Sequence, residues 1–166
     1  MAGPASERRV VPGLLDRLLD DDPQTTVEPP WREGQVIREL KRSLRRDLED
    51  LLNARRPLDA LPEGLDELPA SLANYGLPDL QSLEVRETHD IQRLCRLIED
   101  CIRRFETRLK NVSVTPLIEP GQERPLDRRL RFAIDAVLVA EPLREAVRLR
   151  SAVDAGSGAI LVEASG

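Results

Sequence analysis

A chain of 166 residues, of which 40 % are apolar, is long enough to bury one hydrophobic core and is typical of a single globular domain. Its formal charge of −5 excludes nucleic-acid binding through overall charge, because phosphate contacts need a basic surface. Its longest apolar run is far shorter than the roughly 18 residues of a membrane helix, so we expect a cytoplasmic protein without direct membrane insertion.

Residues 1–34 are predicted to form a flexible N-terminal segment with one short docking helix at about residues 13–20. Leucine pairs at helical spacing in Leu14-Leu15-Asp16-Arg17-Leu18-Leu19 predict this helix, and it is too short to fold without a groove to bind. Prolines and Gly34 in residues 23–34 predict a connector. Residues 35–166 are expected to form a single α+β domain.

Residues 35–54 are predicted to be a helix, because leucine and isoleucine recur at helical spacing from Ile37 to Leu52. Its opposite face is basic over residues 38–46 and then acidic from Asp47 to Asp50. A solvated face with i, i+4 pairing is the favoured interpretation. A docking surface for an acidic partner, in which Arg45 and Arg46 take part, stays open as the alternative.

The connection from Arg55 to Leu83 contains four prolines and the turn-like sequence Asn74-Tyr75-Gly76-Leu77-Pro78-Asp79. A connection of this length is usually functional or packed by its own side chains. Residues 69–72 predict one helical turn, and the single tyrosine, Tyr75, is expected to anchor the connection to the core.

The helix expected from Thr88 to Phe105 has the most continuous apolar seam of the chain. Cys95 and Cys101 both lie on this seam. Six residues of helix place their Cα atoms about 9 Å apart, which is too far for a disulfide. We therefore expect both to be buried, unreactive thiols.

Beyond this helix the apolar period changes from 3.6 to 2. Alternation predicts one strand around Val112–Val114 that ends at Pro116, a second at residues 130–138 and a third from about Ala146. Residues 119–128 are predicted to be a loop, residues 154–158 a hairpin turn, and residues 159–163 a fourth strand. Helices followed by antiparallel strands predict an α+β fold with the helices on one face of the sheet.

The join between the last helix and the first strand is charged, with Glu106 and Arg108 on either side of Thr107. On an extended join these two side chains point the same way and can pair with each other. A buried pair of this kind is costly to break, since the remaining partner is stranded. The pattern favours a structural clasp, completed within the chain or by another subunit, over catalysis.

Other chemistry is not indicated. His89 has no cysteine at ligand spacing and is interpreted as a surface or capping residue, so no metal site is expected. Phosphate-binding loops, nucleophile elbows and metalloprotease helices are absent from the sequence. Carboxylates are abundant, so a glycosidase-like pair stays open. We expect no catalytic residue and no cofactor.

Four motifs occur in one order along the chain: Leu14-Leu15-Asp16-Arg17-Leu18, Ser43-Leu44-Arg45-Arg46-Asp47-Leu48-Glu49 continuing to Arg55, Ser71-Leu72-Ala73-Asn74-Tyr75-Gly76-Leu77-Pro78-Asp79, and Phe105-Glu106-Thr107-Arg108-Leu109. Together they strongly resemble TssE, the type VI secretion baseplate subunit, which belongs to the phage baseplate wedge proteins once labelled lysozyme-like. The resemblance spans nearly the whole chain.

The resemblance implies a non-enzymatic wedge component that joins TssF and TssG, with TssK nearby, and offers its sheet to the TssB/TssC sheath. The hallmark of that family is Glu-Pro-Arg at the helix-to-strand join; here Thr107 replaces the proline, which restores a backbone N–H and removes the fixed φ. The interaction residues expected are Glu106, Thr107, Arg108, Tyr75, Arg45, Arg46, Leu14, Leu15, Arg17 and Leu18. A peptidoglycan hydrolase and a wedge subunit of a related contractile phage tail or particle are the alternatives.

Overall fold

The computed structural model describes residues 13–18, 33–56, 64–80, 88–117, 129–141, 143–154 and 157–164. Within them lie helices α1 (Leu14–Leu18), α2 (Glu33–Asn53) and α3 (Thr88–Phe105), 3-10 turns η1 (Leu68–Ala70) and η2 (Leu72–Asn74), and strands β1 (Leu109–Pro116), β2 (Arg129–Ala140), β3 (Leu143–Asp154) and β4 (Ile160–Ala164). The predictions for residues 1–12, 19–32 and 118–128 lie outside the described residues.

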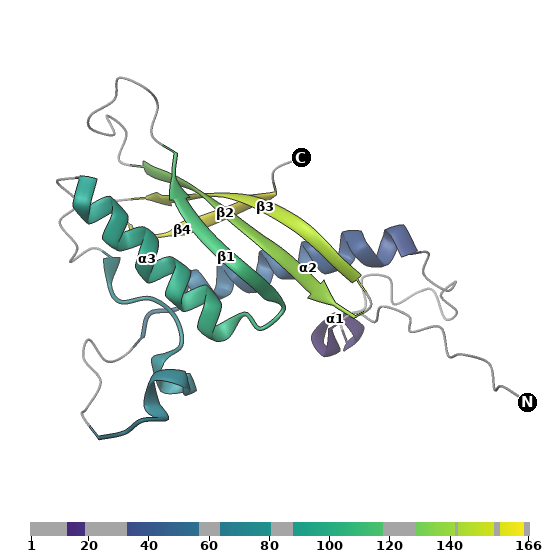
Figure 1. Cartoon of the computed structure of the whole chain (residues 1–166), viewed down its shortest axis with the longest axis horizontal. Helices are drawn as coiled ribbons and strands as arrows, with labels where there is room; N and C mark the ends of the chain where they lie inside the picture. The colour runs from purple at the N-terminus through teal and green to yellow at the C-terminus, as the bar shows by residue number, and fades with distance from the viewer. Residues whose placement is uncertain are drawn as a thin grey trace, which may run out of the picture.

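The four strands form one antiparallel sheet in the order β1-β2-β3-β4, so each strand pairs with its neighbour in sequence. Helices α2 and α3 lie across one face of this sheet, α3 along β1 and α2 along β4 (Figure 1). The predicted α+β class, with helices on one face of an antiparallel sheet, is confirmed.

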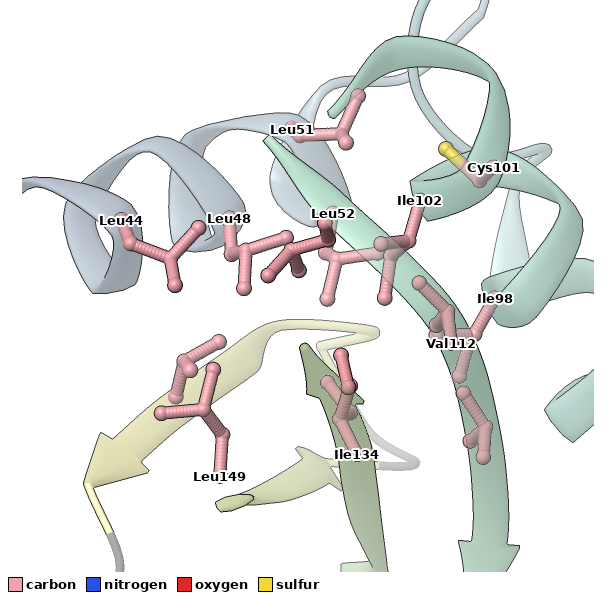
Figure 2. Packing of buried hydrophobic residues seen from close by; sticks show 14 of the residues in the cluster. Leu44, Leu48, Leu51, Leu52, Ile98, Cys101, Ile102, Val112, Ile134 and Leu149 are labelled. Atoms are coloured by element: carbon pink, nitrogen blue, oxygen red, sulfur yellow. The ribbon is translucent and has the colours of Figure 1, made fainter. Parts of the chain in front are cut away.

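The core lies between the two long helices and the sheet. Leu44, Leu48 and Leu52 of α2 point toward the strands. Ile98 and Ile102 of α3, which lies beside α2 on the same face, point into the same layer (Figure 2). All five are at most 2 % exposed. Burying an aliphatic side chain of this size stabilises the fold by roughly 1.5–3 kcal/mol, so these two seams supply much of its stability.

A β-bulge near the start of β1 sets which of its side chains face the core. Lys110 pairs with Val137 and Ser113 with Asp135, so two residues of β1 stand opposite one of β2. Asn111 takes the left-handed conformation with φ of 53°, which asparagine tolerates better than most residues. The extra residue places both Leu109 and Val112 in the core. Alternation alone did not predict this bulge.

The hairpin between β2 and β3 is tighter than the sequence predicted. Ala140 pairs with Leu143, so β3 begins at Leu143 and not near Ala146. The predicted start of β3 was wrong because of Glu145. This residue lies opposite Leu138 on the helix-facing side, where alternation predicts an apolar residue. Its carboxylate accepts a hydrogen bond from Lys41 of α2 at 2.6 Å, which explains a charge at that position.

The segment after η2 is fastened to the end of α2 by two backbone hydrogen bonds. Leu77 donates to the Ala54 carbonyl at 2.9 Å, and Arg56 donates to the Leu77 carbonyl at 2.9 Å. Tyr75 packs edge-on against Phe105 with ring centroids 5.3 Å apart, as expected of an anchor. Residues 74–80 therefore pack against the core as part of the fold.

Both cysteines are buried and free, as predicted. The Cys101 thiol donates to the Gly76 carbonyl at 3.4 Å. Burial raises the pKa of both thiols, that of Cys101 to about 11. Because the thiolate is the reactive form, both groups are unreactive in the native protein at neutral pH.

We expect Gly76→Ala to be severely destabilising. Gly76 has φ of 94°, and an added Cβ would lie 2.1 Å from the Ala54 carbonyl oxygen. Positive φ costs an alanine about 1–2 kcal/mol, and the clash adds to it. Gly64→Ala is the matched control, since φ is 82° there and nothing lies within 4 Å of the added atom. Equal losses in urea unfolding midpoint for the two variants would contradict this account.

Candidate interaction site at the helix-to-strand join

The join between α3 and β1 is a tight turn and not the extended segment that the sequence suggested. Glu106 still donates its backbone N–H to Ile102 as a last helical bond of 2.8 Å, and Leu109 donates back to the Glu106 carbonyl at 3.2 Å. The Arg108 carbonyl accepts from Val139 of β2 at 2.8 Å. Backbone bonds from the helix, the turn and the sheet therefore fix the position of this join.

Glu106 and Arg108 form a bidentate ion pair across the turn. The Arg108 Nε donates to Oε1 of Glu106 at 2.8 Å and Nη2 donates to Oε2 at 2.5 Å. The backbone N–H of Arg108 also donates to Oε1 at 3.0 Å. Glu106 is only 7 % exposed, so the pair is largely shielded from water. The predicted pairing of these two residues is confirmed.

The ion pair continues across α2 to α1. Arg108 Nη2 also donates to Asp47 Oδ2 at 2.7 Å, and the other Asp47 oxygen accepts from Arg46 at 3.0 and 3.1 Å. Arg46 Nη2 in turn donates to Asp16 Oδ1 at 2.8 Å. We call Glu106, Arg108, Asp47, Arg46 and Asp16 the ion-pair chain.

The electrostatics of the ion-pair chain keep both arginines charged. Hydrogen bonds that Arg108 donates to Glu106 raise the pKa of Arg108, and those that Arg46 donates to Asp16 and then to Asp47 raise the pKa of Arg46. Both oxygens of Glu106 are held by Arg108, so this carboxylate is not positioned to exchange a proton with a substrate. The arrangement joins three elements and offers no acid–base pair. Among the described residues, no cluster of His, Cys, Asp and Glu could hold a metal ion.

The other expected interaction residues take no part in the ion-pair chain. Thr107 is exposed at the turn, and Tyr75 is half-buried against Phe105. Arg45 is exposed on α2. Leu15 and Leu18 of α1 are 56 % and 73 % exposed. The side chains of Leu14 and Arg17 lie outside the described part of the chain.

Two members of the ion-pair chain, Asp47 and Asp16, were not among the expected site residues. Asp47 is 61 positions from its partner Arg108, and Asp16 is 30 positions from Arg46. Pairs at these separations leave no periodic signal in the sequence. The available hint is that both residues lie within the four motifs, Asp16 in residues 14–18 and Asp47 in residues 43–49.

Comparison with known proteins identifies the family of this chain. The family model described as "Baseplate wedge protein gp25" matches residues 38–143, well over half of the chain. The chain belongs to this baseplate wedge family. The matched region runs from α2 to the first residue of β3 and includes every member of the ion-pair chain except Asp16.

A solved structure described as "The baseplate complex from the type VI secretion system" contains a chain similar to this one. The two share 19 % identity with a TM-score of 0.46, over 69 % of this chain and 94 % of the other. The search of curated proteins finds no match. The resemblance to TssE, read from four motifs, is confirmed at the level of the baseplate wedge family. Across the described residues, no helix is long and apolar enough to cross a membrane.

Breaking the buried ion pair should cost far more than breaking an exposed one. We expect Arg108→Met to lower the free energy of unfolding by about 3 kcal/mol, because it strands the Glu106 carboxylate. Arg148→Met is the control. Arg148 pairs with Asp135 at 3.1 Å, and the two side chains are 62 % and 44 % exposed. Losing this ion pair should lower the free energy of unfolding by less than about 1 kcal/mol. Chemical denaturation measures both, and similar losses would show that Glu106 does not depend on its partner.

Asp16→Asn should release α1 while leaving the rest of the fold intact. The Asp16–Arg46 bond is the ion pair that ties α1 to α2. We expect faster amide exchange confined to residues 14–18, with a global stability change under about 1 kcal/mol since Arg46 is partly exposed. Glu39→Gln, at the surface pair with Arg42, is the control. Unchanged exchange in α1 would mean that other contacts hold it.

Proposed function

We propose that this protein is a non-enzymatic structural component of the type VI secretion baseplate wedge, which couples the baseplate to the contractile sheath and helps to start sheath assembly. Membership of the baseplate wedge family over residues 38–143 is the observation that carries the structural role. The order of the four TssE-like motifs supports the type VI assignment. The proposed setting is the cytoplasmic side of the secretion apparatus.

The proposed partners divide between the two layers of the fold. TssF, TssG and TssK would meet the helical side, where Leu15 and Leu18 of α1 are exposed beside the basic face of α2. The TssB/TssC sheath would meet the sheet through strand addition, in which main-chain hydrogen bonds provide the affinity. Strand addition suits a mechanical role, because it transmits position and force without chemistry.

The ion-pair chain supports this division because it connects the two layers. It runs from α1 through α2 to the turn that leads directly into β1, so a partner that moves α1 or α2 acts on the sheet through charged, directional bonds. Charge-assisted bonds of this kind are roughly twice as strong as neutral ones. In the proposed role, Glu106 and Arg108 preserve the angle between the wedge-bound helices and the sheath-facing strands.

The test is co-expression with TssF, TssG and TssK, followed by affinity purification. We expect the wild-type protein to retain the wedge subunits, and the double variant Leu15→Asp/Leu18→Asp to retain at least ten-fold less, because charge would disrupt an apolar contact. Leu65→Asp/Leu72→Asp is the matched control, since both leucines are also exposed but lie away from α1. This control should retain the wedge fully.

Two results would contradict the proposal. Wild-type protein that retains none of the three wedge subunits would remove the baseplate role. Muramidase activity in the purified wild-type protein that is lost in a carboxylate variant would replace it with a peptidoglycan hydrolase.

A further inference from the structure

The two edges of the sheet differ in which backbone groups are unpaired. In an antiparallel ladder, residues alternate between directing their N–H and C=O to one neighbouring strand and to the other. The register of the sheet therefore fixes which groups point outward from β1, from β4, and from the part of β3 that β4 does not cover.

The β1 edge is closed by side chains of α3 and by a proline. Glu99 accepts a hydrogen bond from the Val114 N–H at 3.0 Å, and Arg103 donates to the Val112 carbonyl at 3.0 Å. Glu99 and Arg103 also pair with each other at 2.7 Å. The next outward position is Pro116, which has no N–H to offer. An added strand would have to displace these bonds.

The β4 edge begins with a similar closure. The Asn53 side chain at the end of α2 donates to the Ile160 carbonyl at 2.8 Å and accepts from the Ile160 N–H at 2.9 Å. This amide occupies the position that a residue of a neighbouring strand would take. Strand β4 then ends at Ala164 after pairing only with residues 149–153 of β3.

Among the described residues, the first half of β3 is therefore paired on one side only. Leu143, Glu145 and Val147 direct their backbone groups to β2, whereas Arg144, Ala146 and Arg148 direct theirs to the side where β4 does not reach. All three are exposed. Within the part of the chain that the structure describes, no hydrogen bond to these outward backbone groups is present. This half-edge, residues 143–148, offers three consecutive outward positions.

The side chains of the half-edge restrict what can bind there. Arg144 and Arg148 lie on the open face of the sheet, on either side of Ala146, and Arg148 also pairs with Asp135 of β2 through an exposed ion pair of 3.1 Å. On the helix-facing side, one Glu145 oxygen accepts from Lys41, while Oε2 is buried and has no hydrogen-bond partner among the described residues. A buried acceptor without a donor destabilises the structure, so a donor placed opposite it is favoured.

We propose that the half-edge at residues 143–148 accepts an extended acidic segment of a partner protein, collinear with β4. Its residues opposite Arg144 and Arg148 would be acidic, and its residue opposite Glu145 would carry a hydrogen-bond donor. This inference rests on the proposed function and deepens it, since it selects the edge and the chemistry of the strand that couples the sheet to the sheath.

Self-association through the same edge is disfavoured by charge. Two copies paired antiparallel about Ala146 would place Arg144 of one opposite Arg148 of the other, and like charges directly opposite destabilise a ladder. The arginines therefore oppose a second copy and favour an acidic strand.

Ala146→Pro is the decisive variant. The Ala146 N–H points away from β2, so proline removes an outward donor without breaking a bond of the existing sheet. Ala146→Val keeps the N–H and is its matched control. The probe is co-expressed TssB/TssC, with TssF, TssG and TssK purified in parallel. We expect Ala146→Pro to retain at least ten-fold less sheath protein and normal amounts of wedge subunits, and Ala146→Val to retain both.

A charge series tests the acidic character of the partner. Arg144→Glu should reduce sheath retention about ten-fold, whereas Arg131→Glu, exposed on the interior strand β2, should leave it unchanged. Equal effects would overturn the acidic requirement.

Amide exchange on the free full-length chain gives an independent readout. The amides of Arg144, Ala146 and Arg148 should exchange fast between slow Glu145 and Val147, and become protected in the complex. Two results would overturn the inference and leave the proposed function standing. One is sheath retention that is unchanged by Ala146→Pro, and the other is protection of those three amides in the free chain. If the wild-type protein retains the wedge subunits but no sheath subunits, the proposed coupling to the sheath is contradicted, and so is the proposed role of the half-edge.

Discussion

A carboxylate buried at the end of a helix requires a charged partner, and this requirement at Glu106 organises the structure. Arg108, two positions further along the chain, meets this requirement by donating to both oxygens of Glu106. The tight turn between α3 and β1 carries both residues, and Leu109, the first residue of β1, follows Arg108 directly. The point at which the sheet leaves the helix layer is therefore also the point at which this buried charge is paired.

The same constraint extends to the rest of the helix layer. The guanidinium of Arg108 has a donor left after binding Glu106, and Asp47 of α2 accepts it. The orientation of α2 that turns Leu44, Leu48 and Leu52 toward the strands (Figure 2) also brings the Asp47 carboxylate to Arg108. The leucine seam and the ion-pair chain are thus two sides of one helix orientation. Asp16 then ties α1 to the same helix through Arg46.

Local patterns in the sequence predicted α2, α3 and the order of the strands, because these elements follow apolar periodicity. The pairing of Glu106 with Arg108 could also be predicted, since the two residues are only two positions apart in the sequence. Asp47 and Asp16 could not, because their partners are distant in sequence and only the packing of three helices brings them together. The predicted start of β3 was wrong for a related reason. Glu145 is polar at a helix-facing position, and its partner Lys41 lies more than a hundred residues earlier in the chain.

The closures at the sheet edges have a consequence for the protein before it meets its partners. An unprotected edge pairs with any other unpaired strand, which is how many β proteins aggregate. Here Asn53, Glu99 and Arg103 cover outward groups of β4 and β1 with side chains from helices that already form the core. Among the described residues, these side chains make the covered edge positions less available to an unrelated strand before a partner binds.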